Sequence, residues 1–212
     1  MKRNLILAAL VAAAMPAAAA TNLTLGLTPG YAIPVGPAGK SYGSAFMLGL
    51  SGELPLNDSW SAGLELAYTG PNLQGTSNPV LGTYTSDINT KVWQITPFAR
   101  YSVPMKTGGT SWTPYGIVGA GVYSDKSGAG TIQSASLGPV PVAEGSNVAH
   151  IGFNIGVGAM VDVQPNLSVG LELRYHHYFT TSDVDLDSVG STDKEAVQLF
   201  VPSARVTYKF GS

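Results

Sequence analysis

The sequence predicts an all-β protein, a single eight-stranded antiparallel up-and-down transmembrane β-barrel. Three observations support this fold class. Segments of about ten residues alternate large apolar side chains with small or polar ones, a period of two that is typical of strands with one apolar face. Only 11% of the residues are charged, whereas about a quarter is usual for a soluble domain. After residue 20, no apolar run is long enough for a membrane-spanning helix.

Residues 1–20 have the layout of a secretory signal peptide. Lys2 and Arg3 precede the apolar run LILAALVAAAM, and small residues continue to Ala20, after which we expect cleavage. The run is too short for a transmembrane helix and has no stop-transfer flank. The remaining residues, 21–212, suit one domain, the barrel. The sequence has no cysteine, so stability must come from the architecture and not from disulfides.

In the first half of the chain, strands are expected at 22–33, 42–54, 60–68 and 93–103. The first alternates weakly, whereas the other three have clear apolar faces. Their apolar residues are Tyr42, Phe46, Leu48, Leu50 and Leu54, then Trp60, Ala62, Leu64, Leu66 and Tyr68, then Trp93, Ile95, Ala99, Tyr101 and Val103. The residues between them are mostly small, polar or charged, and they include Glu53, Glu65 and Arg100.

The second half supplies strands at 111–124, 149–163, 167–179 and 200–210. The last three again have one apolar face each, which carries Ile151, Phe153, Ile155 and Val157, then Leu171, Leu173 and Tyr175, then Phe200, Val206, Tyr208 and Phe210. In 111–124 two sets compete for the apolar face, and its orientation stays open: Trp112, Val118 and Val122 against Tyr115, Ile117 and Tyr123.

Prolines interrupt four of these strands, at Pro29, Pro97, Pro114 and Pro202. Proline has no amide hydrogen to donate to a neighbouring strand, and a closed barrel has no free edge where this loss would be harmless. We therefore expect bulges or strand ends at these four positions.

The connections between strands alternate in length. The joins at 55–59, 104–110 and 164–166 are short, and 34–41 is intermediate. Those at 70–90, 124–147 and 180–195 are long, polar and rich in Gly, Ser and Thr. Short turns at one end and long loops at the other are typical of transmembrane β-barrels.

A soluble barrel of the lipocalin type would place the apolar faces inside, around a ligand. Three features argue against it. The polar faces consist mostly of Gly, Ala, Ser, Thr and Asn, an uncharged surface to expose to water. The apolar faces carry too many large side chains for a small lumen, and their aromatic residues gather near strand ends, as at a membrane interface.

Three sequence stretches carry a family resemblance: PYGIVGAGVY (114–123), LELRY (171–175) and the closing VTYKF (206–210). Together with the signal peptide and the eight strands, they resemble small outer-membrane barrels of the OmpA/OmpX type. The resemblance implies the outer membrane of a Gram-negative-type envelope, surrounding lipid, and a last strand that the barrel-assembly machinery recognises. The family usually ends on the aromatic residue, whereas Gly211 and Ser212 follow Phe210 here. An exported N-terminus and an even number of strands place both termini in the periplasm.

Six charged residues fall on the polar faces and are expected in the lumen: Glu53, Glu65, Arg100, Glu172, Arg174 and Arg205. The lumen of an eight-stranded barrel is only wide enough to be filled by side chains. Opposite charges at one height should pair, because an unpaired buried charge is costly. We expect Glu172, Arg174 and Arg205 to meet on adjoining strands, and Glu65 to approach Arg100. These residues either plug the barrel, which we favour, or line a gated pore.

Other function classes find less support. Without Lys2 and Arg3, the chain has 9 basic and 13 acidic residues, a net charge of −4, so no basic patch is available for nucleic acid.

The stretch RYHHYFTTS resembles the His–x–Ser pattern of lipid A deacylases of the PagL type, but Phe179 occupies the serine position. His176 should face the lumen and His177 the outer interface. The acidic residues of 183–194 match an EF-hand only in their first spacings, so no metal or cofactor is expected.

The sequence thus predicts a small, non-catalytic outer-membrane barrel with a charge-plugged lumen. It would serve envelope integrity, or surface display and adhesion through its long loops, where surface ligands could bind. The alternatives are a narrow channel for small or hydrophobic solutes and, behind it, a lipid A-modifying enzyme.

Overall fold

The computed structural model describes residues 22–36, 42–71, 77–78, 82–107, 110–179 and 196–211. The expected signal peptide and the acidic segment 183–194 lie outside the described residues. Within them, no helix is both long enough and apolar enough to cross a membrane.

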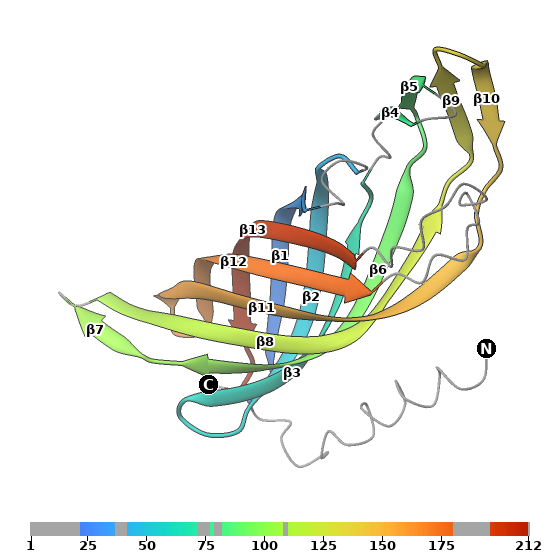
Figure 1. Ribbon diagram of the computed structural model, residues 1–212. Coiled ribbons are helices and arrows are strands. Elements are labelled where there is room, and N and C mark those ends of the chain that lie inside the picture. Colours follow the sequence, from blue (N-terminus) through green and yellow to red (C-terminus); the bar gives the residue numbers. More distant parts are fainter. Residues whose placement is uncertain are drawn as a thin grey trace, which may run out of the picture.

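Eight antiparallel strands form a closed barrel, as the sequence predicts (Figure 1). In barrel order they are β1 (Thr24–Val35), β2 (Ala45–Pro55), β3 (Trp60–Thr69), β6 (Thr90–Ser102), β8 (Thr110–Ser127), β11 (Asn147–Gln164), β12 (Leu167–Phe179) and β13 (Ala196–Lys209). Each strand pairs with the next along the chain, and β13 pairs with β1 to close the ring. The end that holds the turns after β2 and β11 is called the short-turn end here, and the opposite one the long-loop end.

Beyond the barrel, four strands form a separate sheet that the sequence analysis missed. In spatial order they are β10 (Gly138–Val142), β9 (Gly130–Ser134), β5 (Gly82–Ser86) and β4 (Ser77–Asn78). This outer sheet stands past the long-loop end, where β8 and β11 continue toward it (Figure 1). Both strands are therefore longer than predicted. A further short strand, β7 (Met105–Thr107), pairs with β8 at the short-turn end.

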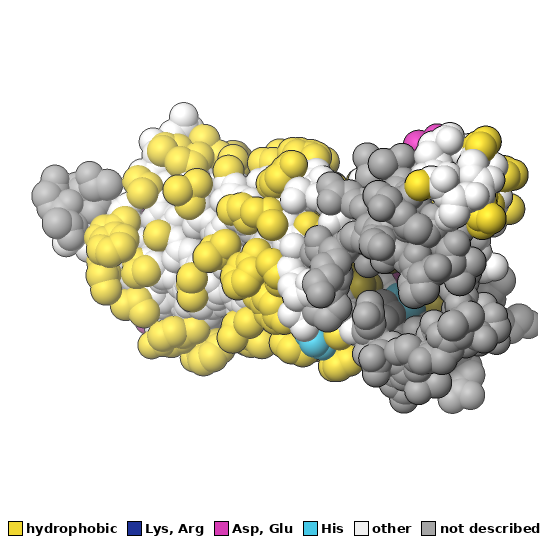
Figure 2. Space-filling view, turned by 45° about the horizontal axis from the view of Figure 1, so that its top comes forward, with side chains coloured by type: hydrophobic (Ala, Val, Ile, Leu, Met, Phe, Trp, Pro, Cys, Tyr) yellow, Lys and Arg dark blue, Asp and Glu magenta, His cyan; other side chains and the backbone are white. Residues whose placement is uncertain are grey.

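The two faces of the barrel wall are inverted relative to a soluble protein. Outward side chains are large, apolar and exposed, up to 73% for Ile151 and Leu171, whereas the inward Arg205 and Glu65 are 0% and 1% exposed. Hydrophobic side chains accordingly spread over the outside of the barrel (Figure 2). This confirms the predicted orientation of the clearly alternating strands, with one correction: Tyr42, expected on the outward face, precedes β2 and packs against the buried lumen side chains. It also settles β8: Tyr115, Ile117 and Tyr123 point inward, and Trp112, Val118 and Val122 outward.

The expectation of bulges or strand ends at the prolines is wrong. All four prolines lie within continuous strands. The pairing of β1 with β13 skips Pro29 and that of β6 with β8 skips Pro97, but both resume in the same register. The one register shift among the described pairs lies between Asp162 and Gln164. A missing donor thus costs a local ladder bond, while the neighbouring pairs on both sides hold the register.

Aromatic rings gather at both ends of the apolar surface. Ring pairs at the short-turn end are Trp60–Tyr101 and Tyr208–Phe210, and those at the long-loop end are Tyr68–Trp93, Tyr175–Phe200 and Phe153–His177. From Trp60 to Tyr68, β3 covers roughly 26 Å at about 3.3 Å per residue. Strand tilt reduces this to roughly 20 Å of height, which fits the ~25 Å apolar band of outer-membrane barrels.

Candidate functional site: a charged layer across the lumen

Six charged side chains meet inside the barrel and form what is called here the charged layer: Glu53 on β2, Glu65 on β3, Arg100 on β6, Glu172 and Arg174 on β12, and Arg205 on β13. Each occupies an inward position of its alternating strand. Five of them are buried, and Arg100 is largely so.

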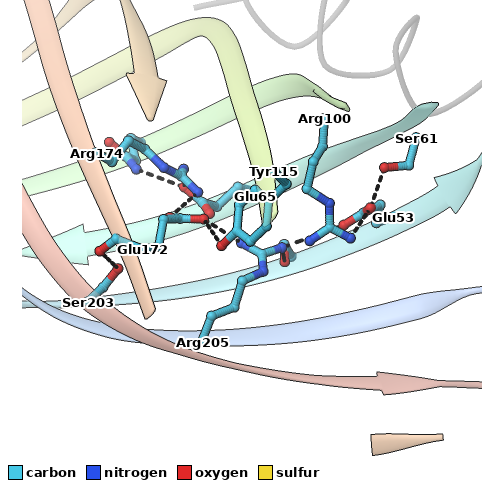
Figure 3. A network of polar contacts seen from close by, with 11 residues as sticks. Glu53, Ser61, Glu65, Arg100, Tyr115, Glu172, Arg174, Ser203 and Arg205 are labelled. Atoms are coloured by element: carbon cyan, nitrogen blue, oxygen red, sulfur yellow. Dashed lines mark hydrogen bonds and ion pairs between the residues drawn. The ribbon is translucent and has the colours of Figure 1, made fainter. Parts of the chain in front are cut away.

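Acidic and basic groups alternate along this layer in one continuous chain (Figure 3). Arg174 binds Glu65 at 2.5 Å and Glu172 at 2.6 Å. Glu172 also lies 3.4 Å from Arg205, which in turn lies 3.6 Å from Glu53. Glu53 completes the chain by pairing with Arg100. Three arginines therefore balance three glutamates, and the layer carries no net charge.

Neutral side chains add hydrogen bonds to the glutamates. The Tyr115 hydroxyl donates to Glu172 at 2.9 Å, and the Gln94 amide donates to Glu65 at 3.3 Å. The Ser61 hydroxyl donates to Glu53. The Tyr115 ring also lies beneath the Arg100 guanidinium, 5.0 Å from it. Buried charges are tolerated when they are both paired and hydrogen-bonded. Each of the three carboxylates has an ion-pair partner and at least one hydrogen bond, although Glu53 Oε2 has only its ion pair with Arg205.

The expected approach of Glu65 to Arg100 is not what the structure shows. The register of β3 and β6 places Arg100 opposite Ser61 and Thr96 opposite Glu65. Arg100 is thus four positions closer to the short-turn end, roughly 13 Å at about 3.3 Å per residue. Arg100 meets Glu53 instead, and Glu65 reaches across the lumen to Arg174. Glu172, Arg174 and Arg205 do meet on adjoining strands.

Inward glycines leave the room that these long side chains occupy. A Cβ at Gly26 would lie 2.5 Å from the Ser51 hydroxyl and 3.3 Å from the Arg205 guanidinium. A Cβ at Gly158 would lie 2.5 Å from the Tyr115 ring. The glycines on the polar faces therefore leave space in the lumen for the arginine side chains and for Tyr115.

A second layer, which sequence reasoning missed, fills the lumen toward the long-loop end. This aromatic layer consists of Tyr123, His176 and Tyr178. The Tyr123 ring stacks on Tyr178 at 4.9 Å, and its hydroxyl lies 3.1 Å from His176 Nδ1. The apolar residues packed with it are Ala32, Met47, Ala67, Val197, Leu199 and Val201. Tyr123 was not identified because both faces of β8 are apolar in the sequence.

Two cavities show how tightly the layers fill the barrel. One of about 10 Å³ lies between the layers, lined by Glu65, Glu172, Arg174 and His176 among others. That is about the space of one water molecule. The other, of about 330 Å³, lies at the short-turn end, where Arg100 and Tyr115 form part of its lining. The charged and aromatic layers thus separate this cavity from the long-loop end.

The histidines occupy three different environments. His176 faces the lumen, as expected, and His177 faces outward against Phe153 at 5.1 Å. The Tyr175 hydroxyl lies 3.4 Å from His177 Nδ1. His150, near the long-loop end, pairs with Asp125 at 2.6 Å. In the part of the chain that the structure describes, no group of three or more His, Cys, Asp or Glu side chains is arranged to hold a metal ion.

Comparison with known proteins agrees with this architecture. The profile of the outer membrane protein beta-barrel domain family matches residues 5–210. The chain belongs to this family. No curated protein sequence matches this outer-membrane barrel.

Solved structures similar to this outer-membrane barrel share its fold. OprG from Pseudomonas aeruginosa is 15% identical, with 91% of this chain and 97% of OprG covered and a TM-score of 0.56. Neisserial surface protein A is 16% identical, with 90% and 98% covered and a TM-score of 0.52. The outer membrane enzyme PagL is 14% identical, with 86% and 97% covered, but its TM-score of 0.39 is too low to support any argument. At these identities the likeness establishes the fold alone.

Proposed function

We propose that this protein is a non-catalytic outer-membrane barrel whose lumen is closed by its charged layer, and that it displays its long-loop end at the cell surface. In that role it contributes to envelope integrity or adhesion. Both termini then lie in the periplasm, and the C-terminal strand β13 is the segment that the barrel-assembly machinery receives.

The observation that carries the proposal is the continuous chain of six charged groups. It links β6, β2, β13, β12 and β3, so it ties opposite walls of the barrel together. A permeant ion would have to separate several of these pairs, and each separation leaves a buried charge without its partner. The aromatic layer adds a second obstruction behind it.

Display of the long-loop end is supported by the outer sheet. Its four strands come from two of the long connections and pair with one another outside the barrel. The β9–β10 turn is ordered by Ser134, whose hydroxyl accepts hydrogen bonds from the amides of Ser136 and Leu137. Leu137 is 61% exposed at its tip. Such a projecting surface suits contact with a partner outside the cell.

Single-channel recording in planar bilayers tests the closed lumen. The parent protein should stay closed, and Arg174→Leu should open more often because it frees Glu65 and Glu172. Removing the aromatic obstruction as well, in Arg174→Leu/Tyr123→Ala, should increase conductance further. Steady, large conductance from the parent, unaltered by substitutions at Glu172, Arg174 and Arg205, would favour the channel.

The proposed orientation has its own test. Protease added to intact cells should cut within 70–90, 124–147 or 181–194, while the turns at 55–59 and 164–166 stay protected until the outer membrane is permeabilised. Cleavage confined to those two turns in intact cells would reverse the orientation and leave the closed lumen unaffected.

A further inference from the structure

Two lysines lie directly opposite each other near the long-loop end. Lys91 on β6 pairs in register with Lys126 on β8. Like charges in a directly opposed cross-strand pair are destabilising. The other lysines in the described part of the chain, Lys106 and Lys209, lie at the short-turn end. At the long-loop end, an anion beside the two lysines would therefore relieve this repulsion.

Both lysines lie on the outer surface of the wall. Lys91 is two residues from Trp93 and shares its outward face, and Lys126 shares a face with the outward Val122. The next outward pair toward the barrel centre is Trp93 opposite Ser124, and the Trp93 ring lies 4.8 Å from Tyr68. The ammonium groups thus stand at the edge of the aromatic girdle, where lipid head groups begin.

Among the described residues, Glu144 supplies a carboxylate to these two cations. Glu144 Oε1 lies 2.7 Å from Lys126 Nζ. The hydrogen bond from Lys126 lowers the pKa of Glu144, and the nearby charge of Lys91 acts in the same direction. Glu144 is therefore ionised at neutral pH, and the group of three retains one positive charge. Asn147 faces Lys126 from β11, and its amide nitrogen is a further donor.

We propose that Lys91 and Lys126 bind a phosphate group of a phosphorylated lipid in the outer leaflet, of the lipid A type. Two ammonium groups suit a phosphate dianion. The exposed Trp93 and Ile95 below them offer an apolar surface for the acyl chains. A soluble anion would contact the lysines alone, whereas a phosphorylated lipid would contact both the lysines and the apolar surface of Trp93 and Ile95. The inference names a lipid partner for the proposed surface barrel, and it rests on the long-loop end facing outward.

Native mass spectrometry of the protein in neutral detergent micelles tests this site. Detergent micelles impose no membrane orientation on the protein. A loss of lipid binding in this experiment can therefore be distinguished from an error in the proposed orientation or in the closed lumen. The probes are lipid A with its phosphates, dephosphorylated lipid A, and inorganic phosphate as a competitor. The variants are Lys91→Gln/Lys126→Gln and, as a control matched in charge, Lys106→Gln/Lys209→Gln.

Neutralising the two lysines should weaken lipid A binding roughly 10- to 30-fold, because each lysine near an anionic lipid surface contributes roughly 5-fold and two are removed. The control pair should bind as the parent does. Glu144→Gln should bind more tightly, because it removes the competing carboxylate. Equal weakening by the control pair, or equal binding of dephosphorylated lipid A, would overturn the proposal. Displacement by inorganic phosphate would do so too, because it would indicate a site for soluble anions.

Discussion

The charged layer and the aromatic layer close the same lumen by different physical means. In the charged layer, long side chains cross between strands that are not neighbours, as Arg174 does to reach Glu65. In the aromatic layer, Tyr123 and Tyr178 stack with methionine and aliphatic side chains as in a soluble core. The stability of the charged layer depends on the charged atoms that pair, whereas that of the aromatic layer depends on the volume that its side chains fill. The two layers should therefore respond differently to substitutions that preserve shape.

Arg174→Leu should cause the largest loss of stability in the barrel. It leaves the carboxylates of Glu65 and Glu172 without their closest cation, although Gln94, Tyr115 and Arg205 still contact them. Removing one partner of a buried ion pair typically costs ~3–5 kcal/mol. Reversible urea unfolding in lipid vesicles measures the loss. Arg174→Lys should recover part of it, since a lysine is charged but lacks the second arm that reaches both glutamates.

The surface pair provides the control for this measurement. Glu144→Gln breaks an ion pair with Lys126 in which both side chains are well exposed. Exposed pairs contribute little, because water already solvates both ions. An Arg174→Leu variant no less stable than Glu144→Gln would show that the charged layer does not hold the barrel together.

The alternation of apolar and polar residues predicted most strands of the barrel wall and the six residues of the charged layer. It did not predict which of these six residues form ion pairs with one another. A period of two assigns a residue to a face, which placed Glu53 and Arg205 correctly inside. It gives neither height nor position around the barrel. Hence Arg100 was expected beside Glu65, whereas the register puts it four positions lower.

The features that sequence reasoning missed lie where alternation is weak. β8 is apolar on both faces, so Tyr115 and Tyr123 could not be assigned to the lumen. The strands β9 and β10 are five residues each, both begin with a glycine, and β10 contains two prolines. Their pairing depends on contacts with each other and with β5, which no local pattern records.

Tyr123→Phe should cost much less than Arg174→Leu. It keeps the ring that stacks on Tyr178 and removes only the hydroxyl, which lies 3.1 Å from His176 Nδ1 and 3.5 Å from Asn154 Nδ2. The loss of one such hydrogen bond typically costs about 1 kcal/mol. Tyr123→Ala, which also removes the volume, should cost clearly more. If both Tyr123 variants were equally unstable, the hydroxyl and not the packed volume would hold this layer, and the contrast between the layers would fail.

The smallest effect is expected for His177, and it separates the inside of the wall from the outside. His176 and His177 are adjacent in sequence, yet His176 is buried against Tyr123 and His177 stacks on Phe153 in the outer girdle. His177→Phe preserves an aromatic ring at the interface, so the free energy of unfolding should change by less than about 0.5 kcal/mol. His176→Phe should cost more, because it removes the partner of the Tyr123 hydroxyl inside the barrel. Lipid A from cells that produce the His177→Phe variant should keep the acylation pattern of cells that produce the parent, as measured by mass spectrometry. A change in that pattern, with the barrel still folded, would contradict a purely interfacial ring and would support a lipid A-modifying enzyme.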